Sequence, residues 1–300
     1  MKKLFYLLMF AAATFCITSC GSDGDDNNPE NGGSSGGSSG GGSSVSSTFK
    51  GPQAVLGNNR IKKLAVYYSD SEEIDHSHGF SYDNNGYVSD ITNYDENGNI
   101  YTRIVFSYEN GVNGILYDKN GNPKQHLNPQ IGGNGFVVYG EQVDEKGNNE
   151  YSRYTYNTSD QIQSVTHGDV GESTPSDDVQ TVTYSDGNLI KVTEGSTIIE
   201  AFYSTESLTA ITNTTGMMLY DICYHMDGVD EVGAWFFCGL IGKGGKNLPL
   251  VVKETNGNET ITYNYTWTLD NQNRPTQLIR HKSSNKSDNT STKKYTLEWY

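Results

Sequence analysis

Apolar and polar residues alternate along much of this chain. The clearest run covers residues 260–269, in which the apolar positions are Ile261, Tyr263, Tyr265, Trp267 and Leu269. A second run places Ile100, Ile104 and Phe106 on one face, opposite polar residues. An alternation with a period of two is typical of β-strands that bury one face and leave the other in water.

Clusters rich in Asn and Gly separate these runs at short intervals. They lie at residues 84–86, 96–99, 109–111, 119–122, 145–148, 185–188 and 255–258. Asn and Gly accept the positive φ angles that hairpin turns require. We therefore predict an all-β domain over residues 51–300, built as one large antiparallel meander. Because a long sheet must hide its edges, we expect it to be barrel-like or strongly curved.

One segment, residues 216–250, interrupts this rhythm. Its residues 232–241 are mostly apolar, which does not suit a strand with one solvated face. We predict a short helical or buried insertion near residues 229–242 that closes one end of the sheet. The Gly- and Lys-rich residues 242–249 are predicted to form a loop with their lysines in water.

The chain begins with the features of an export signal. Lys2 and Lys3 precede an apolar run over residues 4–15, which has the length of a secretory signal and is too short to span a bilayer. Residues 17–20 (ITSC) resemble the lipobox of bacterial lipoproteins. This resemblance implies that residues 1–19 are removed as a signal peptide and that Cys20 carries a diacylglycerol and a further acyl chain such as palmitate. The alternative is an ordinary cleaved signal with an incidental cysteine.

Residues 20–50 are predicted to form a flexible tether. Its acidic start at residues 21–26 resembles the export tag of Bacteroides-type lipoproteins. That resemblance implies the outer membrane, with the cell surface favoured and the periplasmic face as the alternative. Residues 31–47 are almost wholly Gly and Ser, a composition that behaves as a random coil and gives the tether a reach of about 25 to 30 Å.

The net charge of the chain limits its partners. Loss of Lys2 and Lys3 with the signal leaves 19 basic and 36 acidic residues, a net charge of −17. Such a polyanion repels the phosphates of nucleic acids, so we expect no nucleic-acid partner. Of the cysteines that remain unmodified, Cys223 and Cys238 are a possible disulfide in an exported protein, and two buried thiols are the alternative.

No catalytic or metal-binding pattern stands above the background, and we expect no cofactor. His76 and His78 would share a strand face and make half of a metal site, but such a polar run is more often a solvated loop. Asp95 opens a sequence like a calcium loop that lacks its final glutamate, which favours a hairpin turn. Residues 242–246 resemble a phosphate-binding loop only superficially. Cys238 lies among aromatic residues, where a thiol is unreactive.

The last quarter of the chain resembles a known family. The residues that carry the resemblance are Gly239, Gly242, Lys243, Lys246, Asn247, Leu248 and Pro249, together with residues 263–267 and 273–276. They are similar to a motif of uncharacterised Bacteroides-type lipoproteins that have a porin-like antiparallel β-meander domain. The resemblance implies an architecture and a location, and it implies no chemistry.

Three functional hypotheses follow from these patterns. The favoured one is a non-enzymatic binding or structural module, held on the membrane by its lipid anchor, for a glycan, a peptide or a neighbouring outer-membrane protein. The first alternative is a hydrolase that uses carboxylates in the mouth of the barrel. The second is a transmembrane barrel, which would require an apolar outer belt.

Overall fold

The computed structural model divides the chain into two units, Met1–Ser46 and Ser47–Tyr300. The structure describes residues 49, 56–69, 71–109, 111–127, 129–143, 149–171, 179–216, 235–286 and 290–300. The predicted signal peptide, Cys20 and most of the predicted tether lie outside the described residues. Cys223 and the first part of the predicted insertion lie outside them as well.

The second unit is built almost entirely from β-strands. In chain order these are β1 (Ile61–Tyr67), β2 (Ile74–Tyr82), β3 (Val88–Tyr94), β4 (Ile100–Ser107), β5 (Asn113–Asp118), β6 (Pro123–Leu127), β7 (Gln130–Ile131), β8 (Val137–Val143), β9 (Asn149–Tyr156), β10 (Ile162–Asp169), β11 (Val179–Ser185), β12 (Asn188–Glu194), β13 (Thr197–Phe202), β14 (Ile211–Thr212), β15 (Asn247–Leu248), β16 (Val251–Asn256), β17 (Glu259–Leu269), β18 (Pro275–Ser284) and β19 (Ser291–Trp299). Seventeen of them form one sheet, and β14 pairs with β15 in a second. The predicted all-β antiparallel fold is confirmed.

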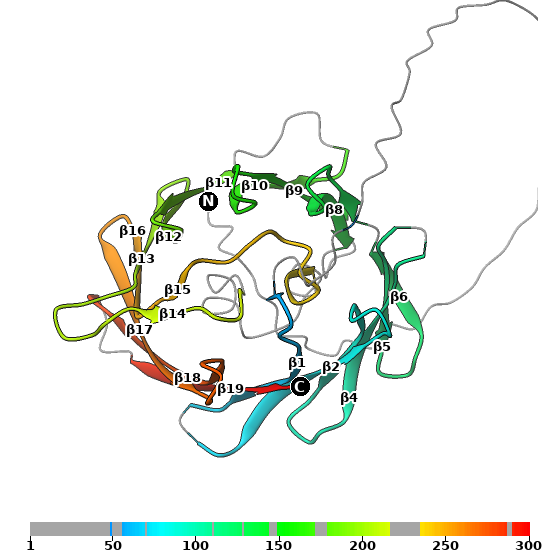
Figure 1. Ribbon diagram of the computed structural model, residues 1–300, viewed down its shortest axis with the longest axis horizontal. Coiled ribbons are helices and arrows are strands. Elements are labelled where there is room, and N and C mark those ends of the chain that lie inside the picture. The colour runs from blue at the N-terminus through cyan, green and yellow to red at the C-terminus, as the bar shows by residue number, and fades with distance from the viewer. Residues whose placement is uncertain are drawn as a thin grey trace, which may run out of the picture. The chain divides into compact units, whose positions relative to one another are not determined.

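The paired strands of the large sheet are antiparallel, and most pairs are consecutive along the chain, so the chain follows a meander. The first and last strands also pair, with Leu64 of β1 opposite Leu297 of β19. Strands β13 and β16 are neighbours although residues 203–250 separate them. The ring is open at one place, because no ladder joins β6 to β7 or β8 among the described residues. Figure 1 shows the strands arranged around a common interior.

The alternation in the sequence sets which side chains face this interior. Tyr263 and Tyr265 of β17 and Tyr295 of β19 are buried, as their phase predicts. Ile100 is an exception, since its side chain is 47% exposed. The register between β3 and β4 shifts between Asn93 and Tyr94, which face Thr102 and Ile100. The shift takes Ile100 out of phase with Ile104 and Phe106, so this part of the predicted buried face is wrong.

Five hairpins share one hydrogen-bond arrangement. Their first residues are Asp83, Asp95, Asp118, Asn157 and Asp270, and in each the side-chain Oδ1 accepts bonds from the backbone N–H groups two and four residues later. The fourth residue of each turn has a positive φ. These are turns in which a short side chain replaces a backbone acceptor. The prediction of a hairpin at Asp95, in place of a calcium loop, is confirmed.

The interior of the ring is occupied by residues 235–250, which we call the plug. One helical turn at residues 235–237 is followed by a loop and by β15. Figure 1 shows the plug and β14 inside the ring. The buried plug residues are Trp235, Phe236, Phe237, Cys238, Leu240, Ile241, Leu248 and Leu250. The predicted buried insertion is therefore confirmed for its described part. No described helix is long and apolar enough to cross a membrane.

Candidate functional site

The motif that carried the family resemblance ties the plug to the ends of the surrounding hairpins. The Lys243 N–H donates to the carbonyl of Asp160 at 2.8 Å, and the Lys246 N–H donates to the carbonyl of Gly187 at 3.0 Å. On the far side, the Trp267 indole N–H donates to the carbonyl of Pro249 at 2.8 Å. These bonds satisfy backbone groups that a buried loop would otherwise leave unpaired. The motif thus has a structural role in the described structure.

Four further motif residues show why this segment needs these residue types. Gly242 has a φ of +57°, and a Cβ at this position would lie 2.8 Å from the carbonyl oxygen of Asp160. The Asn247 N–H donates to Oδ1 of Asn188 at 2.8 Å, while Leu248 is fully buried. Gly239 has a φ of +67° at the turn that ends the helical segment. Only glycine adopts such angles at no steric cost.

The same bonds decide against a phosphate-binding loop. A phosphate cradle needs free backbone N–H groups that point at the ligand. Here the N–H groups of Lys243, Gly244 and Lys246 donate to protein carbonyls. The side chains of Lys243 and Lys246 are exposed, and Lys243 pairs with Asp160 at 3.2 Å. The expected loop with its lysines in water is what the structure shows.

Cys238 is a buried free thiol in the plug. Burial raises the pKa of this thiol far above its ordinary value, so it stays protonated and unreactive at neutral pH. Its possible disulfide partner, Cys223, lies outside the described residues.

Polar side chains also face the interior, beyond the plug. Along β17, Trp267 contacts the plug. Tyr265 and Tyr263 are the next two residues on the same face of this strand. The guanidinium carbon of Arg280 lies 5.6 Å from the ring centre of Tyr263 and 5.5 Å from that of Tyr295. Arg280 is 9% exposed, so the two aromatic faces replace part of the water that a guanidinium normally holds. This cluster fixes the middle of β17, β18 and β19.

The two histidines singled out in the sequence lie in β2 and not in a loop. His78 is 3% exposed, so the expectation of a solvated run is wrong at this residue. The two residues do share a strand face, and their ring centres are 5.2 Å apart. Leu64 and Asn93 flank His78 on the neighbouring strands, and this packing removes it from water. Among the described residues, no group of three or more His, Cys, Asp or Glu side chains is placed to hold a metal ion.

A serine–histidine pair was not evident from the sequence. Ser152 of β9 and His167 of β10 are opposite each other, and Ser152 Oγ lies 2.9 Å from His167 Nδ1. A nucleophile must reach its substrate, yet Ser152 is only 2% exposed. We therefore interpret the contact as a cross-strand hydrogen bond.

An aromatic and charged surface patch lies on the outer face of β8 and β9. We call it the platform, and it consists of Tyr139, Glu141, Tyr151 and Arg153. The two tyrosine rings are stacked at 5.9 Å with an angle of 23° between their planes. The Arg153 guanidinium carbon lies 5.5 Å from the Tyr139 ring centre and 5.2 Å from that of Tyr151. Arg153 and Glu141 are exposed, and both rings are half-buried.

The register of the sheet creates this platform. Tyr139 faces Arg153 and Glu141 faces Tyr151, so the four side chains share one side of the β8–β9 ladder. Gly168 of β10 faces Tyr151, and a Cβ there would lie 2.7 Å from the tyrosine hydroxyl. The Tyr139 hydroxyl donates to Glu141 Oε1 at 2.6 Å, and this bond raises the pKa of Tyr139 to about 12. The only signal of this platform in the sequence is the alternation of Tyr with charged residues, and this alternation does not say which residues of β8 and β9 face each other.

Comparison with solved structures places the fold among porin-like proteins. A porin-like protein from Bacteroides uniformis is 15% identical, with a TM-score of 0.60 over 80% of this chain and 96% of that one. A second, from Bacteroides vulgatus, is 15% identical, with a TM-score of 0.52 over 81% of this chain and 99% of that one. Neither protein-family models nor curated protein sequences gave a match. The chain therefore has the porin-like antiparallel β-meander that the family resemblance implied.

Proposed function

We propose that this protein is an outer-membrane lipoprotein, held by lipid on Cys20, that binds a glycan on the outer face of its β-sheet. The observation that carries the binding function is the platform of Tyr139, Glu141, Tyr151 and Arg153. Tyrosine offers a large rigid apolar face with a polar tip, at little cost in conformational entropy. A sugar ring would stack its C–H face on the tyrosines while its hydroxyls bond to the carboxylate and the guanidinium.

The plug favours a binding module over a channel. Trp235, Phe237 and Ile241 are at most 5% exposed inside the ring. The plug is bonded to the rim at Asp160, Gly187 and Trp267. An interior filled to this extent offers no aqueous path in the part that these residues occupy. Ligand recognition is then left to the outer surface and the hairpins.

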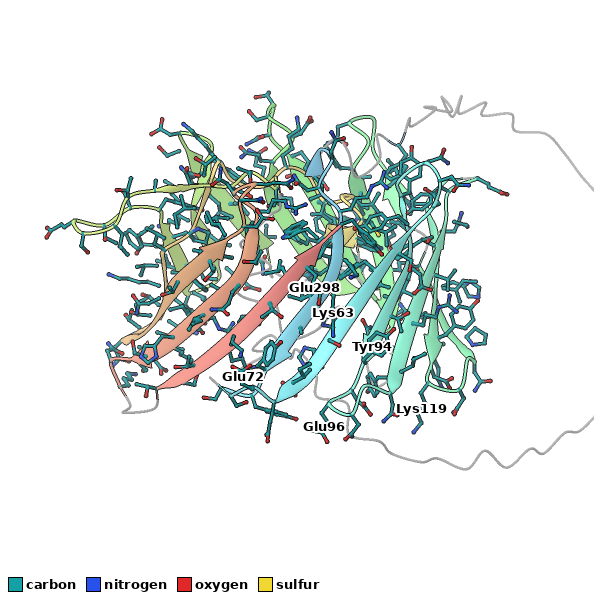
Figure 2. All side chains as sticks on the ribbon, turned by 60° about the horizontal axis from the view of Figure 1, so that its bottom comes forward. Lys63, Glu72, Tyr94, Glu96, Lys119 and Glu298 are labelled. Carbon is teal, nitrogen blue, oxygen red and sulfur yellow. The ribbon has the colours of Figure 1, made fainter. Side chains whose placement is uncertain are left out.

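The outer face argues against a barrel embedded in lipid. Figure 2 shows Lys63 of β1 and Glu298 of β19 on the outside of the sheet. Exposed Arg103 of β4 pairs there with Asp90 of β3. An Arg or Lys side chain on a lipid-facing strand costs about 2 to 4 kcal/mol at the bilayer midplane. A body tethered in water avoids this cost.

A glycan-binding measurement on the purified full chain tests this function. We expect Tyr139→Ala with Tyr151→Ala to weaken binding to glycans at least about tenfold, because both stacking faces are lost. Tyr94→Ala is the matched control, since Tyr94 is another tyrosine of the outer face (Figure 2) and packs over Gly79. Binding that persists in the double variant, or that is found only with peptides, would refute the glycan proposal.

A further inference from the structure

We propose that His76 and His78 form a two-imidazole site for a divalent transition-metal ion, of the class of Zn²⁺ or Cu²⁺, on the interior face of β2. The proposal is independent of glycan binding. Its basis is the arrangement of two neighbouring rings, each of which contacts an oxygen through its Nδ1 atom.

The hydrogen bonds around His78 assign its tautomer. Its Nδ1 lies 2.8 Å from Oδ1 of Asn93, and the Asn93 amide N–H donates to Thr102 Oγ1 at 2.8 Å. The bond to Thr102 orients the amide so that its oxygen faces the imidazole. An amide oxygen only accepts, so the proton of His78 is on Nδ1 and the lone pair is on Nε2. This is the tautomer that binds a metal through Nε2.

The Nε2 atom of His78 is buried and has no hydrogen-bond partner among the described residues. A buried polar atom without a partner carries a desolvation cost that no hydrogen bond offsets. A metal ion on Nε2 would remove this cost.

The spacing of the two rings fits a shared ion. A metal held by two ring nitrogens at about 2.0 to 2.1 Å each, with a tetrahedral angle between them, places the ring centres about 5 Å apart. The ring centres of His76 and His78 are 5.2 Å apart, and their planes meet at 74°. The residues are two positions apart in β2, so both side chains project from the same face of the strand.

His76 has a carboxylate beside its Nδ1 atom. Its Nδ1 lies 3.4 Å from Oδ2 of Asp75, and a carboxylate on one ring nitrogen of a metal-binding histidine fixes its orientation and raises its basicity. The side chain of His76 keeps 21% of its surface exposed, although its Nε2 atom is buried, so an ion would enter beside the exposed part of this ring. Imidazole ligands favour zinc, copper and nickel over magnesium and calcium.

The described protein supplies two ligands, since no third His, Cys, Asp or Glu is placed to complete a cluster. Water or a donor atom of a bound molecule would fill the other positions. Open positions distinguish a binding or catalytic metal from a structural one.

The test is a titration of the metal-free full chain with Cu²⁺ and Zn²⁺. We expect one ion per chain, and a Cu²⁺ electron paramagnetic resonance spectrum with two imidazole nitrogens. His76→Gln and His78→Gln should each remove one nitrogen and lower the affinity at least about tenfold. Asn93→Leu should keep both nitrogens and weaken binding about 10- to 100-fold, as loss of an orienting partner does. His281→Gln is the control, because His281 is exposed and bonds to Thr292.

A measurement on the unaltered chain guards against variants that fail to fold. With ¹⁵N-labelled histidine, Zn²⁺ should shift the Nε2 resonances of two of the six histidines, and these should be the two that the His76 and His78 variants lack. Shifts confined to other histidines would overturn the proposal. Unchanged affinity in a variant that carries both His76→Gln and His78→Gln would do the same.

Discussion

Five hairpin turns depend on one residue each that adopts a positive φ. Gly86, Gly98 and Gly121 hold this place in three of them, whereas Asp160 and Asn273 hold it in the others. The side chain of the first turn residue caps the backbone in the same way in all five. The turn therefore tolerates a polar residue in place of glycine, provided that the cap is kept.

We expect Gly98→Ala to lower the free energy of unfolding by roughly 1 to 2 kcal/mol, the cost of a left-handed residue that has a Cβ. Gly98 has a φ of +78°, and a Cβ there would meet nothing within 4 Å, so only the backbone angle is tested. Urea denaturation measures the change. Asn273→Gly is the reciprocal variant. It should not destabilise the protein through backbone strain, because glycine adopts the positive φ of this position at no steric cost. Equal stability of Gly98→Ala and the parent would show that the turn is not strained by a side chain.

His78 should make the fold sensitive to mild acid. Its pKa in the folded protein is about 3, below the ordinary 6.5, so between these pH values the unfolded chain binds a proton that the folded chain does not. Stability is then complete above about pH 6.5 and falls with decreasing pH by up to about 1.4 kcal/mol per unit. Urea denaturation from pH 7 to pH 4 measures this slope.

The variant His78→Leu should reduce the dependence of the free energy of unfolding on pH between pH 7 and pH 4. Asp95, Asp118 and Asp270 have pKa values below the ordinary 3.8, so the stability linked to them is lost at lower pH. A slope that is identical in parent and variant would assign the acid sensitivity to other groups.

The plug packs against the strands that surround it because a strand residue at the contact lacks a side chain. Gly140 of β8 faces the interior where Trp235 lies, and a Cβ on Gly140 would stand 1.7 Å from the indole ring. The indole is 1% exposed. A strand residue without a side chain thus makes the space for the largest side chain of the plug.

Gly140→Ala should displace Trp235 and destabilise the protein by about 3 kcal/mol, the upper range for overpacking a core. Gly133→Ala is the matched control, since a Cβ there would meet nothing within 4 Å. Guanidinium denaturation followed by tryptophan fluorescence gives both values. Gly140→Ala should lower the free energy of unfolding by less in the Trp235→Leu variant than it does in the parent. Equal effects of the two glycine variants would contradict the proposed fit.

The sequence predicted the elements of this fold better than their mutual contacts. The alternation at Tyr263 and Tyr265 and the Asn-Gly turns were enough for strands and hairpins, because both depend on local chemistry. The turn at Asp160 carries no glycine and was missed. The platform at Tyr139 and the Ser152–His167 pair depend on register between strands, which local patterns do not contain.

Pairing between the first and last strands brings the two ends of the β-domain together. Strand β1 pairs with β2 on one side and with β19 on the other, and the Tyr300 N–H donates to the carbonyl of Arg60 at 2.9 Å. The chain therefore leaves the ring beside the point where its first strand begins. One gap remains, between β6 and the β7–β8 pair, among the described residues. The short β6 at this gap begins with Pro123, a residue that discourages pairing with another chain.

The membrane attachment of this body should depend on one residue outside it. Cys20→Ala removes the proposed site of lipidation, and the charged outer face at Lys63 and Glu298 (Figure 2) gives the folded unit no apolar surface there to hold it in a bilayer. We expect the variant to move from the membrane pellet to the soluble fraction after fractionation. Cys16→Ala is the matched control, because it alters a cysteine within the predicted signal peptide and should leave the protein in the pellet. If Cys20→Ala stays in the pellet as the parent does, attachment comes from the β-domain itself, and the proposal of a tethered module is wrong.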